Sequence, residues 1–362
     1  MSETAFQGLP LQGSPRTPGR TAVRVHEADR RDHARWDRFV TACSEATFFH
    51  RAGWQTVIEE AFAHRTYFLY AEAEGRIEGV LPLAEIKSAL FGHKLVSLPF
   101  CVYGGIAAST DRAATALDNA AQALADLRCV DLLEYRSVDA RHPAWKHDDL
   151  YVTFRKPLHA DDERNLLDIP RKQRAMVRKG IKAGLQASID VDTEDFYRAY
   201  SDSVHRLGTP VFSKRYFRKL REVFGADCEI LTVRSGRQVV SSVMSFYFRD
   251  EVLPYYGGGT AAARELAAND FMYWEVMRGA CARGTRIFDY GRSKQGTGSF
   301  SFKKNWGFEP KPLGYEYLLV KARELPQHNP LNPKYRHFIN AWKRMPLALA
   351  NAIGPHIVRG LG

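Results

Sequence analysis

The sequence of 362 residues has none of the signatures that mark several large protein classes. It contains no run of about 20 consecutive apolar residues, so it predicts no membrane-spanning helix. Its five cysteines include no CxxC pair and its histidines form no HxxxH or HExxH motif, which argues against a disulfide framework and a metal site. A GxSxG motif is missing too, so Ser–His–Asp catalysis has no support. These absences predict a soluble protein of the reducing cytoplasm that binds no metal.

What the sequence does contain is enough apolar residues for two cores, together with a large positive charge. Hydrophobic residues make up 45% of the chain, which is too long for one ordinary domain. The formal net charge of +11 predicts an anionic partner, such as nucleic acid, a phosphorylated substrate or an acidic membrane surface. Charge alone does not choose among them. Residues 1–21 are rich in Gly, Pro and Ser and predict a disordered tail.

Two parts of the chain repeat one predicted order of elements: a hairpin, a strand, a helix and a strand. In the first part, Tyr103-Gly104-Gly105 precedes a helix over 111–127 and a strand over 130–137. In the second part, Tyr256-Gly257-Gly258 precedes a helix over 269–283 and a strand over 286–293. Self-similarity of this length indicates duplicated units, although any two mixed α/β segments share some of it.

This order of elements is that of the GNAT (acetyltransferase) core, in which the sheet splits and an acyl donor enters the cleft. The sequence therefore predicts an α/β (α+β) chain of two tandem GNAT (acyl-CoA N-acyltransferase-like) domains with mixed sheets. We place the first domain at 22–157 and the second at 158–322. A basic amphipathic segment follows at 323–362, and Pro346 must break or kink its helix.

The second domain opens with a basic run over 171–182 that no acidic residue interrupts. On a helix, four of its cations fall on one stripe, while Val177, Ile181 and Leu185 form an apolar stripe for docking. Like charges on one face destabilise an isolated helix, so an anionic partner would stabilise this one; a solvated linker helix is the alternative. We predict that the run binds phosphate groups of tRNA or CoA. Its cations are Arg171, Lys172, Arg174, Arg178, Lys179 and Lys182.

The segment 289–308 has the composition of a ligand-binding loop. Its glycines let the backbone approach a ligand closely. Its lysines and arginine supply positive charge, and its aromatic residues could form the walls of a pocket. It is not a Walker A loop. The acetyl-CoA signature [RQ]xxGx[GA] is met only in part, because Ser293 occupies the Arg/Gln position. An ordinary glycine-rich connection with solvent-facing lysines is the alternative.

The segments PRKQRAMVRKGIKAGL and FDYGRSKQGTGSFSFKKNWGF resemble the FemAB/FemX family of peptidoglycan-bridge aminoacyltransferases and their BioF2-type GNAT relatives. LPFCVYGG and the C-terminal segment resemble the FemAB-like subgroup associated with exosortase/PEP-CTERM systems and exopolysaccharide gene clusters. The resemblance implies direct transfer of an aminoacyl group from charged tRNA to an amine, with no metal and no bound cofactor. The long helical arm of the classical bridge enzymes has no counterpart in this sequence.

The resemblance also implies that Lys303 stabilises the transfer intermediate. We predict Lys303 and Asp289 as catalytic residues, with Asp289 orienting the acceptor amine or accepting its proton; capping of the local backbone is the alternative for Asp289. Packing at a strand–turn junction is the alternative for both predicted tyrosines. The predicted substrate-binding residues are Tyr103, Tyr256, Arg292, Ser299, Phe302 and Lys304.

Taken together, these features predict an acyl- or aminoacyl-transferase that forms an amide on an amine of a cell-envelope or exopolysaccharide precursor, without a covalent enzyme intermediate. Its donor is aminoacyl-tRNA or acyl-CoA. A CoA-dependent N-acyltransferase and a non-catalytic assembly factor of an exosortase or exopolysaccharide system are the alternatives. The basic amphipathic stretch 334–358 predicts either peripheral contact with the inner membrane or packing on the protein itself.

Overall fold

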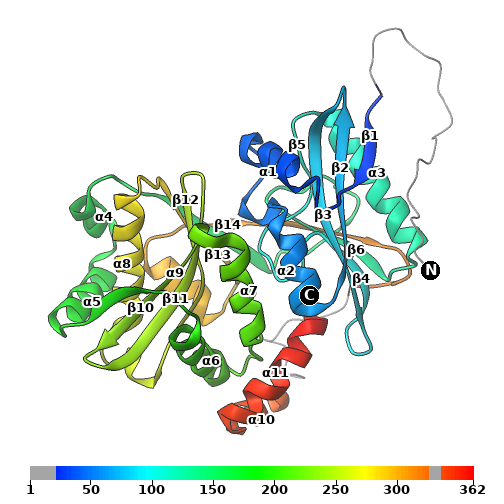
Figure 1. Cartoon of the computed structure of the whole chain (residues 1–362). Helices are drawn as coiled ribbons and strands as arrows, with labels where there is room; N and C mark the ends of the chain where they lie inside the picture. The colour runs from blue at the N-terminus through cyan, green and yellow to red at the C-terminus, as the bar shows by residue number, and fades with distance from the viewer. Residues whose placement is uncertain (1–21, 326–335) are drawn as a thin grey trace.

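The computed structural model describes residues 22–325 and 336–362, and it contains two mixed sheets that lie side by side (Figure 1). The disordered tail predicted at 1–21 lies outside these residues. Each sheet has helices on both faces. The α/β class and the two mixed sheets that the sequence predicts are therefore confirmed.

The first sheet is built mainly from the N-terminal part of the chain. The elements of this domain are β1 (Arg24–Glu27), α1 (His33–Ala42), α2 (Gly53–Phe62), β2 (Arg65–Ala73), β3 (Arg76–Ser88), β4 (Gly92–Val96), β5 (Ala107–Ala108), α3 (Asp111–Leu127), β6 (Leu132–Ser137), β7 (Lys146–His147) and, from much later in the chain, β15 (Gly314–Leu319). The strand order is β1-β2-β3-β4-β6-β15-β7, with β5 paired to β3. Helix α3 packs on one face of this sheet, and α1 and α2 pack on the other (Figure 1).

The second sheet follows the same plan. Its elements are β8 (Tyr151–Pro157), α4 (Asp162–Asp168), α5 (Arg171–Lys182), β9 (Gln186–Asp190), α6 (Glu194–Leu207), α7 (Lys214–Phe224), β10 (Cys228–Ser235), β11 (Gln238–Phe248), β12 (Glu251–Gly259), α8 (Ala268–Ala282), β13 (Ile287–Lys294), α9 (Gly298–Asn305) and β14 (Pro310–Pro312). The strand order is β14-β8-β13-β12-β11-β10-β9. Helices α6 and α7 face the first domain, whereas α8 covers the opposite face with α5 beside it (Figure 1).

One strand from late in the chain completes the first sheet. Strand β8 ends at residue 157, yet it pairs with β13 in the second sheet. Strand β15 begins at residue 314, yet it pairs with β6 in the first sheet. Strands β8 to β14 are consecutive in the chain and all belong to the second sheet, so among the described strands β15 alone crosses to the other sheet. The boundary drawn at 157 therefore lies after the first strand of the second sheet.

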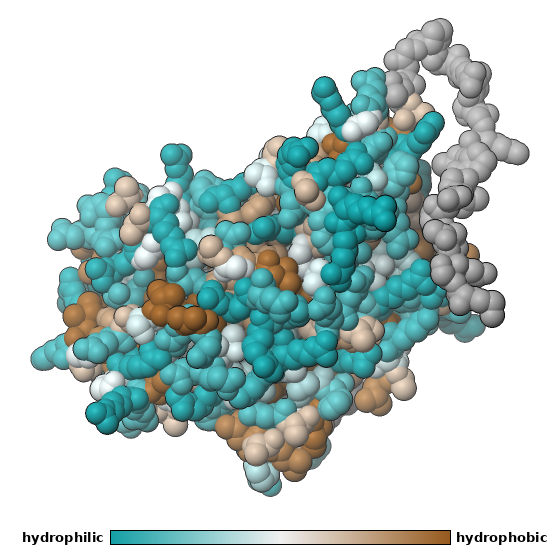
Figure 2. Space-filling view, viewed as in Figure 1, coloured by the Kyte–Doolittle hydropathy of each residue, from teal (hydrophilic) through white to brown (hydrophobic). Residues whose placement is uncertain are grey.

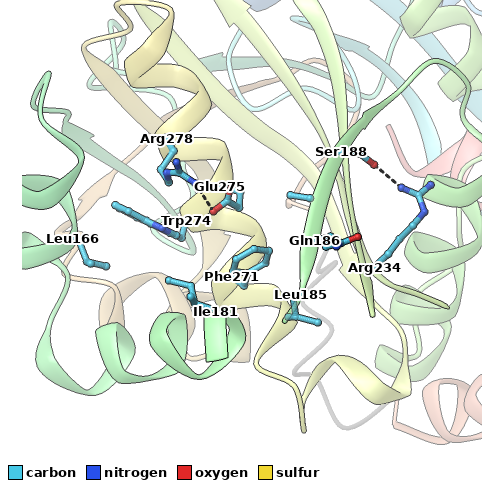
Figure 3. A pocket seen from close by; sticks show the side chains of 11 residues that line it. Leu166, Ile181, Leu185, Gln186, Ser188, Arg234, Phe271, Trp274, Glu275 and Arg278 are labelled. Atoms are coloured by element: carbon cyan, nitrogen blue, oxygen red, sulfur yellow. Dashed lines mark hydrogen bonds and ion pairs between the residues drawn. The ribbon is translucent and has the colours of Figure 1, made fainter. Parts of the chain in front are cut away.

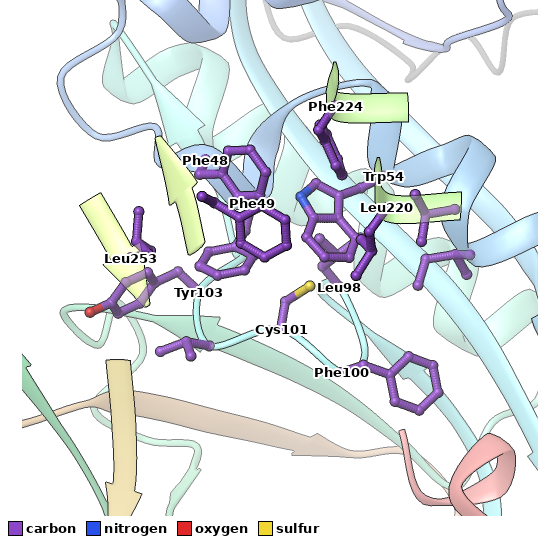
Figure 4. Packing of buried hydrophobic residues seen from close by; sticks show 14 of the residues in the cluster. Phe48, Phe49, Trp54, Leu98, Phe100, Cys101, Tyr103, Leu220, Phe224 and Leu253 are labelled. Carbon is purple, nitrogen blue, oxygen red and sulfur yellow. The ribbon is translucent and has the colours of Figure 1, made fainter. Parts of the chain in front are cut away.

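One hydrophobic core contains residues of both domains. Phe48 and Trp54 come from the first domain, and Phe224 comes from the second (Figure 4). Phe246 of the second domain belongs to the same core. The ring centroid of Phe48 lies 4.5 Å from that of Phe246 and 4.7 Å from that of Phe224. Close-packed aromatic contacts of this kind fix the relative position of the two domains.

The basic run forms the helix α5, and its buried face agrees with the predicted one in part. Ile181 is 50% exposed, whereas Gln173, Val177 and Gly180 are buried against the domain. A Cβ at Gly180 would lie 2.7 Å from the Cβ of Phe271, so the glycine allows α5 to approach α8 closely. Val177 and Leu185 of the predicted stripe are buried, and the prediction is wrong for Ile181, because apolar spacing alone does not register the small-residue contact at Gly180.

The C-terminal segment forms two helices, α10 (Arg336–Arg344) and α11 (Leu347–Leu361), which break at Pro346 as predicted. Residues 334 and 335 of the predicted membrane stretch lie outside the described residues. Both helices pack on α6, and α11 continues to β3 and ends between the two domains (Figure 1). Among the described helices, none is both long enough and apolar enough to cross a bilayer.

Candidate active site

The second sheet splits between its two central parallel strands. Strands β12 and β13 pair only at Glu251–Ile287 and Val252–Phe288 and then diverge. An irregularity in β13 accompanies the split, where Gly291 has a φ of +64°, a conformation that residues with a side chain rarely adopt. Beyond these two pairs, the carbonyls of Gly291 and Arg292 accept hydrogen bonds from a side chain.

The corresponding position in the first sheet is filled by the chain itself. Where β4 ends, the amide of Ser97 donates to the carbonyl of Glu134 at 2.8 Å. The amide of Gly104 then donates to the carbonyl of Arg136 at 2.8 Å. The segment 97–104 therefore occupies the space beside β6. Between the two splits in the described structure, the one in the second domain is the candidate for ligand entry.

Lys303 projects from α9 into this split. Its Nζ donates to the carbonyl of Gly291 at 3.1 Å and to that of Arg292 at 2.9 Å. Burial lowers the pKa of Lys303 to about 7; the Asp289 carboxylate opposes this shift and the Arg292 guanidinium adds to it. Both protonation states are therefore populated near neutral pH. In either state, two N–H groups of Nζ donate to the two carbonyls. The third position on Nζ is an N–H in the cation and a lone pair in the neutral amine.

Asp289 lies beneath the split and is 1% exposed. Its Oδ1 accepts the amide of Gly291 at 2.7 Å and its Oδ2 accepts the hydroxyl of Tyr103 at 2.9 Å. The Nε of Arg155 lies 3.4 Å from Oδ2. Burial raises the pKa of Asp289, although Arg155 and these two donors oppose the shift. The geometry matches the backbone-capping alternative: Asp289 holds the bend that presents the Gly291 carbonyl to Lys303.

Arg292 is held in place by aromatic residues. Its guanidinium lies 4.8 Å from the ring centroid of Tyr151, and its NH1 donates to the Tyr315 hydroxyl at 3.1 Å. Tyr315 belongs to β15, the strand that joins the first sheet. A strand of the first sheet thus positions a cation of the second domain.

Lys303 and Arg292 line a cavity of about 360 Å³ between the domains. Tyr256, one of the predicted residues, is also part of its wall. Tyr103 is buried below, beside the aromatic core (Figure 4), and touches the site through Asp289. The aromatic and aliphatic wall includes Phe100, Phe212, Tyr255, Tyr256, Val358 and Leu361.

The part of the predicted loop that carries Lys303 is a helix. Thr297 caps α9 by accepting the amide of Phe300 at 3.4 Å. Ser299 and Lys304 are exposed on this helix, and Phe302 packs against the core of the second domain. The structure therefore does not bring Ser299 or Lys304 to the cavity.

The basic run on α5 lies apart from Lys303, since none of its described residues lines that cavity. It borders a second cavity of about 710 Å³ between α4, α5, α8 and β9. Figure 3 shows its apolar side, with Ile181 of α5 and Trp274 of α8. Two arginines at its edges are engaged: Arg278 pairs with Glu275 at 3.0 Å and Arg234 donates to Ser188 at 2.6 Å (Figure 3).

Sequence reasoning missed several residues that shape the site. Arg155 sits on β8 and Tyr255 precedes the predicted Tyr256, and neither stands in a motif. Val358 and Leu361 come from α11, more than fifty positions after Lys303 in the chain. Only Tyr255, next to the repeated Tyr-Gly-Gly pattern, carried a local signal.

Among the described residues, no cluster of His, Cys, Asp and Glu side chains could hold a metal ion.

Comparisons with known proteins agree with this architecture. Residues 171–304 match the acetyltransferase (GNAT) domain family, and this range contains both Asp289 and Lys303. No curated protein sequence matches the chain.

Among solved structures, FemX is similar over 87% of this chain and 100% of its own, with a TM-score of 0.64 and 14% identity. L-PGS from Bacillus licheniformis is similar over 88% of this chain and 98% of its own, with a TM-score of 0.53 and 13% identity. A tandem GNAT protein from the clavulanic acid biosynthesis pathway is similar over 84% of this chain and 100% of its own, with a TM-score of 0.52 and 13% identity. At these identities the likeness is one of fold. The chain therefore has the tandem GNAT fold that its sequence predicts.

Proposed function

We propose that this protein is an acyl- or aminoacyl-transferase that forms an amide on an amine of a cell-envelope or exopolysaccharide precursor. The observation that carries the proposal is the position of Lys303, whose Nζ lies in the split of the second sheet, on the wall of a cavity between the domains. In the GNAT fold this split receives the acyl donor. The likeness to FemX in fold supports the transfer of a group to an envelope precursor, and the resemblance of the sequence to the exosortase-associated subgroup supports a role beside such a system.

In the proposed reaction the acceptor amine attacks the carbonyl carbon of the donor. A C–N bond forms and the carbonyl oxygen takes the negative charge, which the third N–H of charged Lys303 stabilises. Collapse then breaks the bond to the leaving group, a CoA thiolate or a ribose oxygen of tRNA, which takes up the proton lost by the acceptor nitrogen. Asp289 acts as a positioning residue in this scheme, because it is buried and caps the Gly291 amide. No covalent enzyme intermediate is needed.

The donor is tested by titrating the protein with acyl-CoA and with charged tRNA. We propose that α5 binds donor phosphates, because most of its cations are exposed and no acidic residue interrupts them. Replacing Arg171, Arg178 and Lys182 with alanine should then weaken tRNA binding and flatten its salt dependence by about 0.7–0.9 in log–log slope per lost contact. Replacing Arg215 and Arg218, exposed cations of α7, is the matched control.

If the protein binds CoA tightly at all salt concentrations and does not bind tRNA, it is not an aminoacyl-transferase that uses charged tRNA. That result would favour the CoA-dependent acyltransferase, which the match of residues 171–304 to the acetyltransferase domain also supports. Equal effects of the α5 and α7 substitutions would exclude α5 as the donor site.

We also propose that α10 and α11 contact the surface of an anionic membrane. Residues 325–362 contain five Lys or Arg and no Asp or Glu. Figure 2 shows an apolar patch over these two helices, where Phe338 is 47% and Leu349 is 48% exposed. Exposed apolar side chains beside cations are typical of helices that lie in a membrane interface.

Sedimentation with vesicles tests this contact. The protein should bind vesicles that contain phosphatidylglycerol and release them at high salt, and Phe338→Ser with Leu349→Ser should reduce the bound fraction. Leu167→Ser, on an exposed leucine of α4, serves as the control. Equal binding to neutral vesicles, or no effect of the double substitution, would exclude the contact.

A further inference from the structure

One edge strand of the described sheets lacks the residues that usually keep a sheet edge from pairing with another chain. The first sheet ends in β1 and β7, and the second ends in β14 and β9. Strands β1, β7 and β14 each carry arginine, lysine or proline, which oppose such pairing. Strand β9 has the sequence QASID and contains none of the three. This edge of the second sheet can therefore accept a further strand.

The outer side of β9 faces solvent. The strand pairs with β10 along one side, and apart from this ladder no main-chain hydrogen bond of the described residues involves it. Because alternate amides and carbonyls of a strand point to each side, the outer side presents unpaired donors and acceptors. Ile189 is 54% exposed, and Val191, directly after the strand, is 90% exposed. Unpaired backbone groups beside exposed β-branched side chains form the kind of surface that strand addition uses.

The two ends of β9 have opposite charge. The strand begins just after the basic end of α5, where Lys179 and Lys182 are exposed. It leads into an acidic turn, where Asp192 and Glu194 are exposed. A strand with one positive and one negative end is complementary to a copy of itself that runs in the opposite direction.

Two β9 strands related by a two-fold axis are antiparallel, and a pairing centred on Ser188 uses the whole strand. Each basic end then lies beside the acidic end of the other copy. Ala187 lies opposite Ile189 of the second copy, because both are one residue from the centre. Ala187 also lines the cavity of about 710 Å³ described above, together with Ile181 and Trp274. The apolar side of this cavity can therefore receive Ile189 of the second copy.

We propose that β9 is a dimerisation edge, at which two copies of this chain join their second sheets and Lys182 of each copy pairs with Asp192 of the other. A second copy fits this edge better than an acidic or a basic peptide, because a peptide of one sign would meet like charge at one end of the strand. The proposal is independent of the reaction proposed above.

Analytical ultracentrifugation over a range of protein concentrations tests the proposal. The wild-type chain should form a dimer whose fraction rises with concentration. Ile189→Lys should abolish the dimer, because it places a charge on the edge of the strand. Leu127→Lys, on an exposed leucine of α3, is the matched control and should leave the dimer unchanged. All these positions are exposed, so an unchanged unfolding midpoint shows that each variant is folded.

Charge reversal identifies the antiparallel arrangement. Lys182→Glu and Asp192→Lys should each raise the Kd of the dimer roughly tenfold, because two attractive contacts become repulsive. An equimolar mixture of these two variants should dimerise as well as the wild type. In the mixed dimer each lysine again faces a carboxylate, which holds only if residue 182 of one copy meets residue 192 of the other.

Three results would overturn the proposal. They are a monomer at all concentrations up to about 1 mM, a dimer that Ile189→Lys leaves intact, and a mixture of the two charge variants that dimerises no better than either alone. None of these measurements uses transfer activity. Failure of the proposed function therefore leaves the dimer test unaffected, and loss of the dimer leaves the proposed function to be judged by its own assays.

Discussion

Replacing Lys303 with alanine lowers kcat on the order of 10²–10³-fold in the mechanism proposed above, because it removes one donor to the developing oxyanion. The unfolding midpoint is measured alongside, because the substitution also removes the hydrogen bonds from Nζ to the carbonyls of Gly291 and Arg292. Lys304→Ala is the matched control. The neighbouring lysine is exposed on the same helix, and its loss should leave kcat nearly unchanged.

The pH profile of the same enzyme separates two roles for Lys303. A cationic stabiliser works while the amine is protonated, so activity should fall as pH rises through about 7, the pKa of Lys303. Lys303→Arg keeps the charge well above that pH and should move the falling limb upward, whatever its effect on the maximum rate. A rate that instead rises through pH 7 and is abolished by arginine would identify Lys303 as a general base acting through its lone pair.

Phe48→Ala should destabilise the whole protein by about 3–5 kcal/mol, the usual cost of removing a buried phenylalanine. Phe48 is 1% exposed and packs on Phe224 and Phe246 of the other domain. Because the shared core and the strand β15 join the domains, one cooperative transition should shift as a unit in denaturant. Circular dichroism and hydrogen exchange of β2 and β11 measure it.

Leu127→Ala is the control for this substitution. Leu127 is 66% exposed at the end of α3, and its replacement should change the stability by no more than about 0.5 kcal/mol. Two separate transitions, of which Phe48→Ala moves only one, would show that the domains are independent and that the shared core does not couple them.

The fold could be predicted from the sequence because its local signals agree with one another. The helices predicted over 111–127 and 269–283 are α3 and α8, and the strands predicted over 130–137 and 286–293 contain β6 and most of β13. The return of β15 to the first sheet could not be predicted in this way. A strand pattern records which faces are buried, but it carries no information about the sheet that the strand joins.

The site was predicted in part. Lys303, Arg292 and Tyr256 do meet at one cavity, whereas Ser299 and Lys304 lie on the exposed side of α9. That helix was read as a loop because its glycines dominated the pattern, although Thr297 offered a capping signal. The contribution of α11 was out of reach, since only tertiary packing brings it to β13.

The proposed reaction is tested most directly by mass spectrometry of envelope and polysaccharide precursors from cells that carry either the wild-type protein or Lys303→Ala at equal abundance. The mechanism predicts a precursor whose mass is raised by one acyl or aminoacyl group on an amine in wild-type cells, and its unmodified form in cells with the variant. The same set of precursors in both cells, with any phenotype of the protein retained by the variant, would contradict catalysis at Lys303 and leave an assembly role.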